Sequence, residues 1–226
     1  MSAAHTSEVS EAAAASVWTI VVAAGSGARF GAPKQFLDLG GERVLDRSVA
    51  TAARHSDGIV VVLPAGVDAG PMPGGHSVVC VAGGESRSAS VRNGLAAVAA
   101  DADVVLVHDA ARPLASDAVF DRVIEAVRGG AAGAVPAVPV TDSIRHRVDG
   151  AVDRAPLVAV QTPQAFAADR LRLAHASAGD ATDDATLVEA LGDTVVIVEG
   201  DPRNQKLTTP FDLEVARLAL AQEVSS

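Results

Sequence analysis

The amino-acid sequence predicts a layered α/β domain in which helices flank a mostly parallel sheet and a β-hairpin arm is inserted. Short runs of β-branched residues alternate along the chain with Ala-rich stretches of helical character. Several of these runs are continuously apolar, which is typical of strands buried on both faces of a parallel sheet. Such alternation favours right-handed crossovers between parallel strands. We find no internal repeats.

Length and composition restrict the class of protein. The 226 residues correspond to one large domain, or to one domain with an excursion. Apolar residues make up 49% of the chain, which excludes a disordered protein, yet no apolar run approaches the ~18–20 residues of a membrane span. With 18 basic and 28 acidic side chains the net charge is −10, and aromatic residues are scarce. This composition argues against nucleic acid and a membrane as partners.

The start of the chain and its cysteine content bear on location. Residues 1–16 are rich in Ala, Ser and Glu, and they lack the basic start and apolar middle of a secretory signal. We therefore expect a disordered tail over residues 1–16 and a single domain over residues 17–226. The single cysteine, Cys80, cannot form an internal disulfide, which indicates a reducing compartment and, with it, a cytoplasmic location.

The expected elements follow the chain in order. Strands are expected at the β-branched runs Val17–Ala23, Ile59–Leu63, Ser77–Val81, Val104–His108, Gly133–Val138 and Val195–Val198. Helices are expected at Val44–His55, Arg87–Ala99, Asp117–Arg128, Asp183–Leu191 and Pro210–Gln222. Ser116 fits the N-cap of the third helix, and Gly129–Gly130 fits its end.

Residues of about 139–160 interrupt this alternation. Extended runs lie on both sides of Asp149-Gly150, and Asp-Gly between two such runs is a strong hairpin signal. An arm of this size has little core of its own, so we expect it to pack on another surface, such as a second subunit. The sequence therefore predicts a dimerisation arm at about 139–160.

A glycine-rich loop with two cations follows the first expected strand. Gly25 and Gly27 permit close approach of the backbone, and exposed N–H groups suit a phosphate. Phe30 stands where the dinucleotide fingerprint needs glycine, which disfavours an NAD-dependent dehydrogenase, and no register supplies the Gly-Lys-Ser/Thr of a P-loop. The pair Arg29 and Lys34 instead suits a reaction that develops charge on a triphosphate.

The scarcity of lysine singles out two positions. Of the 18 basic residues 16 are arginine, and the two lysines are Lys34 and Lys206. Lysine supplies a compact point charge that arginine does not replace. Each of the two lies in a loop just after an expected strand. We therefore interpret both lysines as functional, and not as residues that remain by chance in a sequence that favours arginine.

Two further segments allow both a functional and a structural interpretation. Asp109 follows an expected strand, where ligands of open α/β sheets bind, and its carboxylate suits Mg²⁺, although it could simply cap the next turn. The backbone of Gly83 and Gly84 with the hydroxyl of Ser90 could contact a base edge, but Gly-Gly-Glu-Ser is also ordinary capping chemistry. Arg112 could be no more than an ion-pair partner.

Other polar residues are expected to be structural. His108 is expected to be buried and hydrogen-bonded, and Asp183–Asp184 to complement a helix dipole. No Gly-x-Ser-x-Gly elbow supports a Ser-His-Asp hydrolase.

Taken in order, the motifs resemble those of the 2-C-methyl-D-erythritol 4-phosphate cytidylyltransferases of the non-mevalonate isoprenoid pathway. The resemblance covers Val17 to about Leu220. It is carried by Ala-Ala-Gly-Ser-Gly-Ala-Arg29 with Pro-Lys34-Gln, Gly-Gly-Glu-Ser-Arg87 with Ser90-Val, Asp109-Ala-Ala-Arg112-Pro, Val140-Thr-Asp-Ser143-Ile, Val152-Asp-Arg154, Thr162-Pro-Gln, and Gly200 through Lys206-Leu-Thr. Ser143 stands where threonine is expected and keeps the hydroxyl.

The resemblance implies a Rossmann-like fold of the nucleotide-diphospho-sugar transferase type and a homodimer. It implies transfer of the cytidylyl group of CTP to methylerythritol phosphate, with Mg²⁺ on Asp109. Arg29 and Lys34 would hold the triphosphate and stabilise the leaving pyrophosphate, with Lys206 near the phosphates. The remaining nucleotide contacts would be Ala23, Ala24, Gly25, Gly27, Gly84, Glu85, Ser90 and Ala110. The sugar phosphate would be held by Arg112, Ser143, Arg154 and Thr162, some of them across the dimer interface.

The chemistry agrees with such scattered cations. A phosphate nucleophile is already ionised at neutral pH, so catalysis reduces to aligning two anions and offsetting their repulsion. Two alternatives stay open. One is a cytidylyltransferase for another polyol phosphate, such as ribitol 5-phosphate. The other is a catalytically silent nucleotide-binding module, which predicts that Lys34→Ala and Lys206→Ala are tolerated.

Overall fold

The computed structural model describes residues 15–25, 27, 30–73, 78–177 and 179–223. Residues 1–14 of the expected tail and the predicted site residue Arg29 lie outside this part of the chain. Ser16, which we assigned to the tail, is paired: its carbonyl accepts hydrogen bonds from the backbone N–H groups of Asp103 and Val104. Ser16 is thus tied to the sheet domain just before the first strand.

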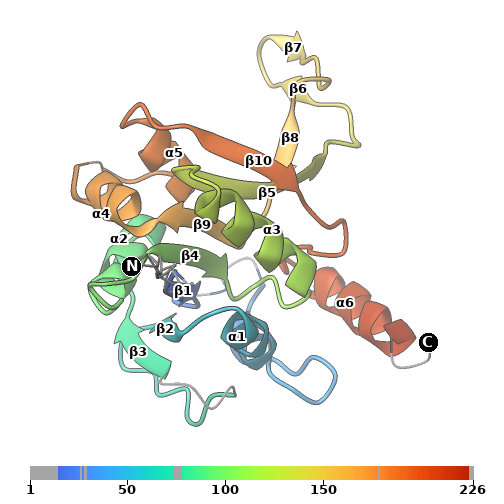
Figure 1. Ribbon diagram of the computed structural model, residues 1–226. Coiled ribbons are helices and arrows are strands. Elements are labelled where there is room, and N and C mark those ends of the chain that lie inside the picture. The colour runs from blue at the N-terminus through green and yellow to red at the C-terminus, as the bar shows by residue number, and fades with distance from the viewer. Residues whose placement is uncertain (1–14, 26, 28–29, 74–77, 178, 224–226) are drawn as a thin grey trace, which may run out of the picture.

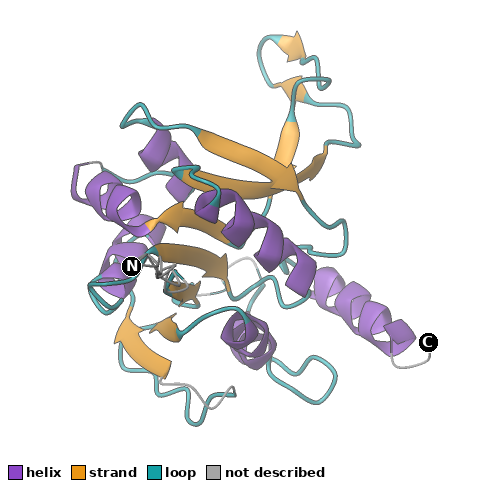
Figure 2. Cartoon of the chain, viewed as in Figure 1, coloured by secondary structure: helices purple, strands orange, loops and turns teal. Residues whose placement is uncertain are grey.

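An eight-stranded mixed sheet runs through the middle of the described chain (Figures 1 and 2). Its strands are β1 Val17–Val22, β2 Gly58–Leu63, β3 Val78–Ala82, β4 Val104–Asp109, β5 Gly133–Pro139, β8 Val158–Val160, β9 Gln164–Ala167 and β10 Val195–Glu199. The order is β10-β5-β9-β4-β1-β2-β3, and β8 pairs with β5 at one end. Neighbours pair in parallel except at β8 and β9, so the prediction of a mostly parallel sheet is confirmed.

The inner strands owe their position to continuous apolar runs. Every residue of β2 and β4 is buried, as their sequences GIVVVL and VVLVHD lead one to expect for strands covered on both faces. Only the last two residues of β4, His108 and Asp109, are polar. These two polar side chains therefore lie at the carboxyl edge of the sheet.

Helices cover both faces of the sheet. They are α1 Val44–Arg54, α2 Arg87–Leu95, α3 Asp117–Arg128, α4 Ala168–Ser177 and α5 Asp184–Glu189. The short 3-10 helix η1 Lys34–Phe36 and the last helix, α6 Pro210–Glu223, complete the described helices, and α6 packs in a small separate cluster with Leu39 and Leu207. The apolar sides of α1 and α3 pack into one buried cluster, and those of α2, α4 and α5 into another on the opposite face. As predicted, α3 ends at Gly129–Gly130, where Gly130 has a φ of 103°.

None of the described helices is both long enough and apolar enough to cross a membrane.

Three differences from the expected elements have local causes. Helix α4 buries Ala168, Leu171 and Ala174 at helical spacing, a pattern that our reading of the sequence missed. Strand β9 was missed because its four residues begin with the polar Gln164, which is nevertheless only 1% exposed between β4 and β5. Helix α2 ends at Leu95 rather than Ala99 because the backbone passes into tighter turns there.

The inserted arm is present and projects away from the sheet, at the upper right of Figure 1. Its tip is a hairpin of β6 Arg145–His146 and β7 Gly150–Ala151, and Gly150 has the positive φ of 88° that the predicted Asp-Gly turn requires. Val148 at this tip is 85% exposed. The arm therefore adds nothing to the core of its own chain.

Candidate active site

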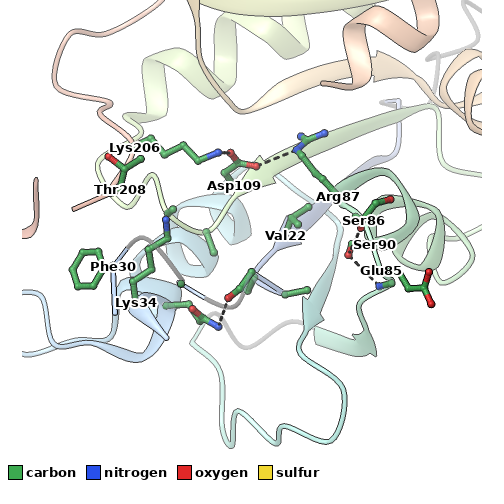
Figure 3. Close-up of a pocket in the computed structure, with 18 residues that line it drawn as sticks. Val22, Phe30, Lys34, Glu85, Ser86, Arg87, Ser90, Asp109, Lys206 and Thr208 are labelled. Atoms are coloured by element: carbon green, nitrogen blue, oxygen red, sulfur yellow. Dashed lines mark hydrogen bonds and ion pairs between the residues drawn. The ribbon is translucent and has the colours of Figure 1, made fainter. Parts of the chain in front are cut away.

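The order of the strands creates a crevice at one edge of the sheet. β1 lies between β2 and β4, so the chain leaves β1 toward one side and later returns to the other. Loops that follow β1 and β4 consequently diverge at their carboxyl ends, which is where open α/β sheets bind ligands. A pocket of about 530 Å³ lies at this point (Figure 3).

The loop after β1 forms the floor of the pocket. Its predicted residues Ala23, Ala24, Gly25, Gly27 and Lys34 all line it. Gly27 has a φ of 68°, and a Cβ atom there would lie 2.0 Å from the carbonyl oxygen of Ala32, so no other residue fits. The carbonyl of Gly27 accepts hydrogen bonds from the next residues of the turn, Phe30 and Gly31.

The start of α2 forms a second wall, which contains the predicted Gly84, Glu85 and Ser90. The Ser90 hydroxyl donates to the carbonyl of Ser86 at 2.9 Å and accepts the N–H of Gly84 at 3.1 Å. Ser86 is the N-cap, since its hydroxyl accepts the N–H of Ala89. The segment of Gly84 to Ser90 therefore both caps α2 and lines the pocket, so the structural and the functional interpretation are compatible. Ser90 holds the turn that contains Gly84.

Charged groups converge at the end of β4. Asp109 lies 2.5 Å from Nζ of Lys206 through Oδ2 and 3.6 Å from Nε of Arg87 through Oδ1. Burial alone would raise the pKa of Asp109, but the positive charges of Lys206 and Arg87 lower it to about 2. Asp109 is therefore an anion at neutral pH.

The two lysines come together in space. Lys34 Nζ donates to the carbonyl of Leu207 at 2.6 Å, so it lies beside the backbone of Lys206. Figure 3 shows Lys206, Asp109 and Arg87 in a row across the pocket, with Lys34 pointing toward the same end. Glu85 and Ser90 lie at the other end. The pocket thus has one strongly charged end, with two lysines and Asp109, and another formed by backbone and hydroxyl groups with the single carboxylate of Glu85.

Buried polar groups support Asp109 from behind. The hydroxyl oxygen of Thr162 accepts the backbone N–H of Asp109 at 3.0 Å and lies 3.2 Å from Nδ1 of His108. His108 is fully buried, and burial lowers its pKa to about 4, so it is neutral at pH 7. The expectation of a buried, hydrogen-bonded His108 is confirmed. Thr162 is buried too and does not line the pocket.

The other residues predicted to hold a sugar phosphate also lie outside this pocket. Arg112 donates to the carbonyls of Asn204 at 2.7 Å and Val160 at 3.3 Å, which joins the loop after β10 to the base of the arm. Ser143 and Arg154 are exposed on the arm, where Arg154 donates to the carbonyl of Thr141. Arg112 and Thr162 both hydrogen-bond to Asn204, whereas Ser143 and Arg154 lie on the arm.

Arg87 is a charged pocket residue that the sequence analysis did not assign. Arg87 is the first residue of α2 and follows a strand by a few residues. The other predicted pocket residues also follow strands, so this position could have identified Arg87. Its carboxylate partner Asp184 was interpreted only as complementing a helix dipole. Asp183 does cap α5, but Asp184 is fully buried, 2.8 Å from Arg87 Nη1 and 3.0 Å from His175 Nε2. The dipole interpretation of Asp184 was therefore incomplete.

The charge of Asp109 predicts a specific acid response. Its pKa is lower in the folded chain than the ordinary 3.8, so the charged carboxylate stabilises the fold above that pH. This contribution is lost as the pH falls from about 4 toward about 2. We expect the free energies of unfolding of the wild type and Asp109→Asn, measured in urea between pH 6 and 3, to converge as the pH falls. A difference that stays constant across this range would contradict the ion-pair interpretation.

Comparison with known proteins agrees with this geometry. The sequence model of the 2-C-methyl-D-erythritol 4-phosphate cytidylyltransferase family (IspD) matches residues 17–222. A protein of that name from Rhodococcus jostii (strain RHA1) is 47% identical over 220 residues, which cover 92% of this chain and 96% of that one. The crystal structure of the Thermus thermophilus protein of that name is similar with a TM-score of 0.77 at 39% identity, over 92% of this chain and 98% of that one.

Proposed function

The chain belongs to the 2-C-methyl-D-erythritol 4-phosphate cytidylyltransferase family, and from this premise we propose how its pocket performs the reaction. The protein transfers the cytidylyl group of CTP to 2-C-methyl-D-erythritol 4-phosphate in the non-mevalonate isoprenoid pathway. The products are 4-diphosphocytidyl-2-C-methyl-D-erythritol and pyrophosphate. One phosphate oxygen of the polyol attacks the α-phosphorus of CTP, and the bond to the β-phosphate breaks.

The charged end of the pocket is our site for the triphosphate. Lys34 and Lys206 approach it from two loops, and Arg29, which lies outside the described residues, belongs to the same loop as Lys34. Fixed cations at this place would offset the repulsion between the two anionic substrates and stabilise the charge that develops on pyrophosphate. Because the attacking oxygen is already ionised, the site needs no general base.

Asp109 is our candidate for holding Mg²⁺. The described residues contain no cluster of three or more His, Cys, Asp or Glu side chains arranged to hold a metal ion alone. Mg²⁺ is commonly bound by one or two carboxylates together with substrate phosphates and water, so a single ionised carboxylate beside the triphosphate site suits it. Bound there, Mg²⁺ would supply positive charge to the phosphate oxygens.

The opposite end of the pocket is our site for the cytidine. Gly84 offers its backbone carbonyl and Glu85 its carboxylate, and the Ser90 hydroxyl, which accepts the N–H of Gly84, holds this turn in place. Ala23, Ala24, Gly25, Gly27 and Ala110 also line the pocket, and their small size would allow the backbone to approach the ribose and phosphates closely.

We further propose that the protein is cytoplasmic and forms a homodimer, and the arm supports the homodimer. Arg154 and Ser143 lie on an exposed arm that also presents apolar side chains, Val148 at its tip among them. Exposed apolar surface of this kind marks an interaction site. We propose that the arm reaches the region beside the pocket of a second subunit, where Ser143 and Arg154 join Arg112 and Thr162, which do not line the pocket of one chain alone, in holding the polyol phosphate.

One observation carries the proposal: Lys34, Lys206 and Asp109, from three distant segments, meet at one end of a pocket of nucleotide size. The test is release of pyrophosphate from CTP with Mg²⁺, in the presence of methylerythritol phosphate or ribitol 5-phosphate. We expect turnover with methylerythritol phosphate. Preference for ribitol 5-phosphate would establish the alternative polyol, and no turnover with either would refute the assignment.

Mixing two impaired variants, assayed at a polyol phosphate concentration too low to saturate Arg154→Ala, tests the arm. Arg154→Ala should weaken binding of the polyol phosphate while leaving the affinity for CTP unchanged, and Lys34→Ala should lower turnover. If Arg154 serves the pocket of the partner, a mixed dimer has one intact pocket, and random mixing should restore up to about a quarter of wild-type activity. Refolding the two variants together and assaying pyrophosphate release measures this. Mixtures no more active than the separate variants would place Arg154 in its own subunit's site.

A further inference from the structure

Asp184 lies outside the pocket but holds one of its residues. It is the first residue of α5, and its side chain is 0% exposed. Arg87 Nη1 donates to Asp184 Oδ2 at 2.8 Å, whereas Arg87 Nε is 3.6 Å from Asp109 Oδ1. Arg87 is therefore closer to Asp184 than to Asp109. Its distance to Asp109 is longer than that of a hydrogen bond.

The position of Asp184 is itself well fixed. Its other oxygen, Oδ1, lies 3.0 Å from Nε2 of His175, which is buried on α4. Ser88, one residue after Arg87, exchanges two hydrogen bonds with the backbone of Ala181, at 3.1 and 3.3 Å. These contacts join the start of α2 to the segment that leads into α5. Both oxygens of Asp184 are thus occupied, and the Arg87 guanidinium is anchored at its far end.

The charges form an alternating row from the interior to the pocket: Asp184, Arg87, Asp109 and Lys206. The Arg87 side chain is only 23% exposed, and a largely buried charge that loses its partner is destabilised, so we expect Arg87 to turn to the nearest remaining carboxylate. Among the described residues, Asp109 is the other carboxylate that Arg87 contacts. Without the charge of Asp184, the guanidinium would close the 3.6 Å gap and pair with Asp109 through two hydrogen bonds.

We propose that Asp184 is a positioning residue that holds Arg87 back from Asp109 and so keeps the Asp109 carboxylate available to the nucleotide and its metal ion. The inference rests on the nucleotide site proposed above and adds a residue that does not line it. Lys206 already occupies Oδ2 of Asp109, so the freedom of Oδ1 decides whether the carboxylate can act on a ligand.

The first test is Asp184→Asn, which keeps the size of the side chain and removes its charge. Calorimetry with CTP and Mg²⁺, and no polyol phosphate, should show a Kd about tenfold above the wild-type value. The matched control is Asp193→Asn, which breaks another Arg–Asp pair, that of Arg170 at 2.7 Å, away from the pocket. This control should bind CTP as the wild type does, with circular dichroism verifying that both variants fold.

The second test separates positioning from a general structural role. If Asp184 acts through Arg87, removing the guanidinium should relieve the defect: Arg87→Gln with Asp184→Asn should bind CTP as Arg87→Gln alone does, within about twofold. A merely structural role predicts that the two losses multiply. A folded Asp184→Asn with wild-type Kd, or multiplied losses, would overturn the inference.

Two further cases need to be distinguished: a wild type that does not bind CTP, and an Asp184→Asn variant that does not fold. Failure of the wild type to bind CTP at all would contradict the nucleotide site itself, which distinguishes it from failure of the role of Asp184. Should Asp184→Asn not fold, a crystal structure of the wild type with CTP and Mg²⁺ decides. Arg87 still on Asp184, with Asp109 facing the ligand, supports the inference, and Arg87 paired to Asp109 refutes it.

Discussion

Replacing Lys34 by alanine should lower kcat by about 10²-fold or more, with a smaller change in the KM for CTP. The ammonium group lies at the charged end of the pocket, where it is held by the carbonyl of Leu207. A fixed charge in this place interacts most strongly when negative charge builds up on the leaving pyrophosphate, so its loss raises the barrier more than it weakens the ground state. Steady-state kinetics of pyrophosphate release measures both constants.

The controls distinguish charge from position. Arg122→Ala removes a cation from the outside of α3, where the side chain donates to the carbonyl of Glu199, and it should leave kcat unchanged. Lys34→Arg keeps the charge but not the compact ammonium, and should recover only part of the lost turnover. A Lys34→Ala variant whose only defect is a higher KM would show that Lys34 binds substrate and transition state equally. Full activity would show that Lys34 takes no part in the reaction.

The framework of the sheet could be predicted because burial leaves a local record in the sequence. Each residue of Gly58–Leu63 is buried, and the run of valines reports this without reference to any other segment. The carboxyl ends of β1 and β4 could be predicted in the same way. Parallel strands end at the same edge of a sheet, so the positions of Ala23 and Asp109 at the ends of two predicted strands already place both residues at that edge. Pocket residues at the end of a strand, such as Ala23 and Asp109, were therefore predictable from the sequence.

Contacts that depend on tertiary packing could not be predicted in this way. Gln164 is polar, yet it becomes an interior residue once β9 enters between β4 and β5. The pairing of Arg87 with Asp184 joins residues 97 positions apart, and two adjacent aspartates at a helix start give no local sign of which is buried. Likewise, no pattern in the arm reports whether Arg154 serves its own pocket or that of a partner.

The second large effect is expected for Asp109→Asn, which should lower kcat/KM by about 10²- to 10³-fold. Asp109 is the carboxylate in the row of charges that crosses the pocket, paired with Lys206 at 2.5 Å. Asparagine keeps the shape and the backbone hydrogen bond to Thr162 but removes the negative charge. If that charge holds Mg²⁺, the variant should also lose most of the effect of Mg²⁺ on CTP affinity, which calorimetry with and without the ion measures.

This double readout separates two roles of one carboxylate. If Asp109 only orients Lys206, its removal should lower turnover while Mg²⁺ still strengthens CTP binding as in the wild type, and the metal assignment would then be wrong. Asp101→Asn, an exposed aspartate outside the pocket, provides the control for a general change of net charge and should retain both activity and the response to Mg²⁺. Because the pKa of Asp109 is about 2, neither readout should vary through titration of this group between pH 6 and 8. A pH-dependent defect in that range would point to another group.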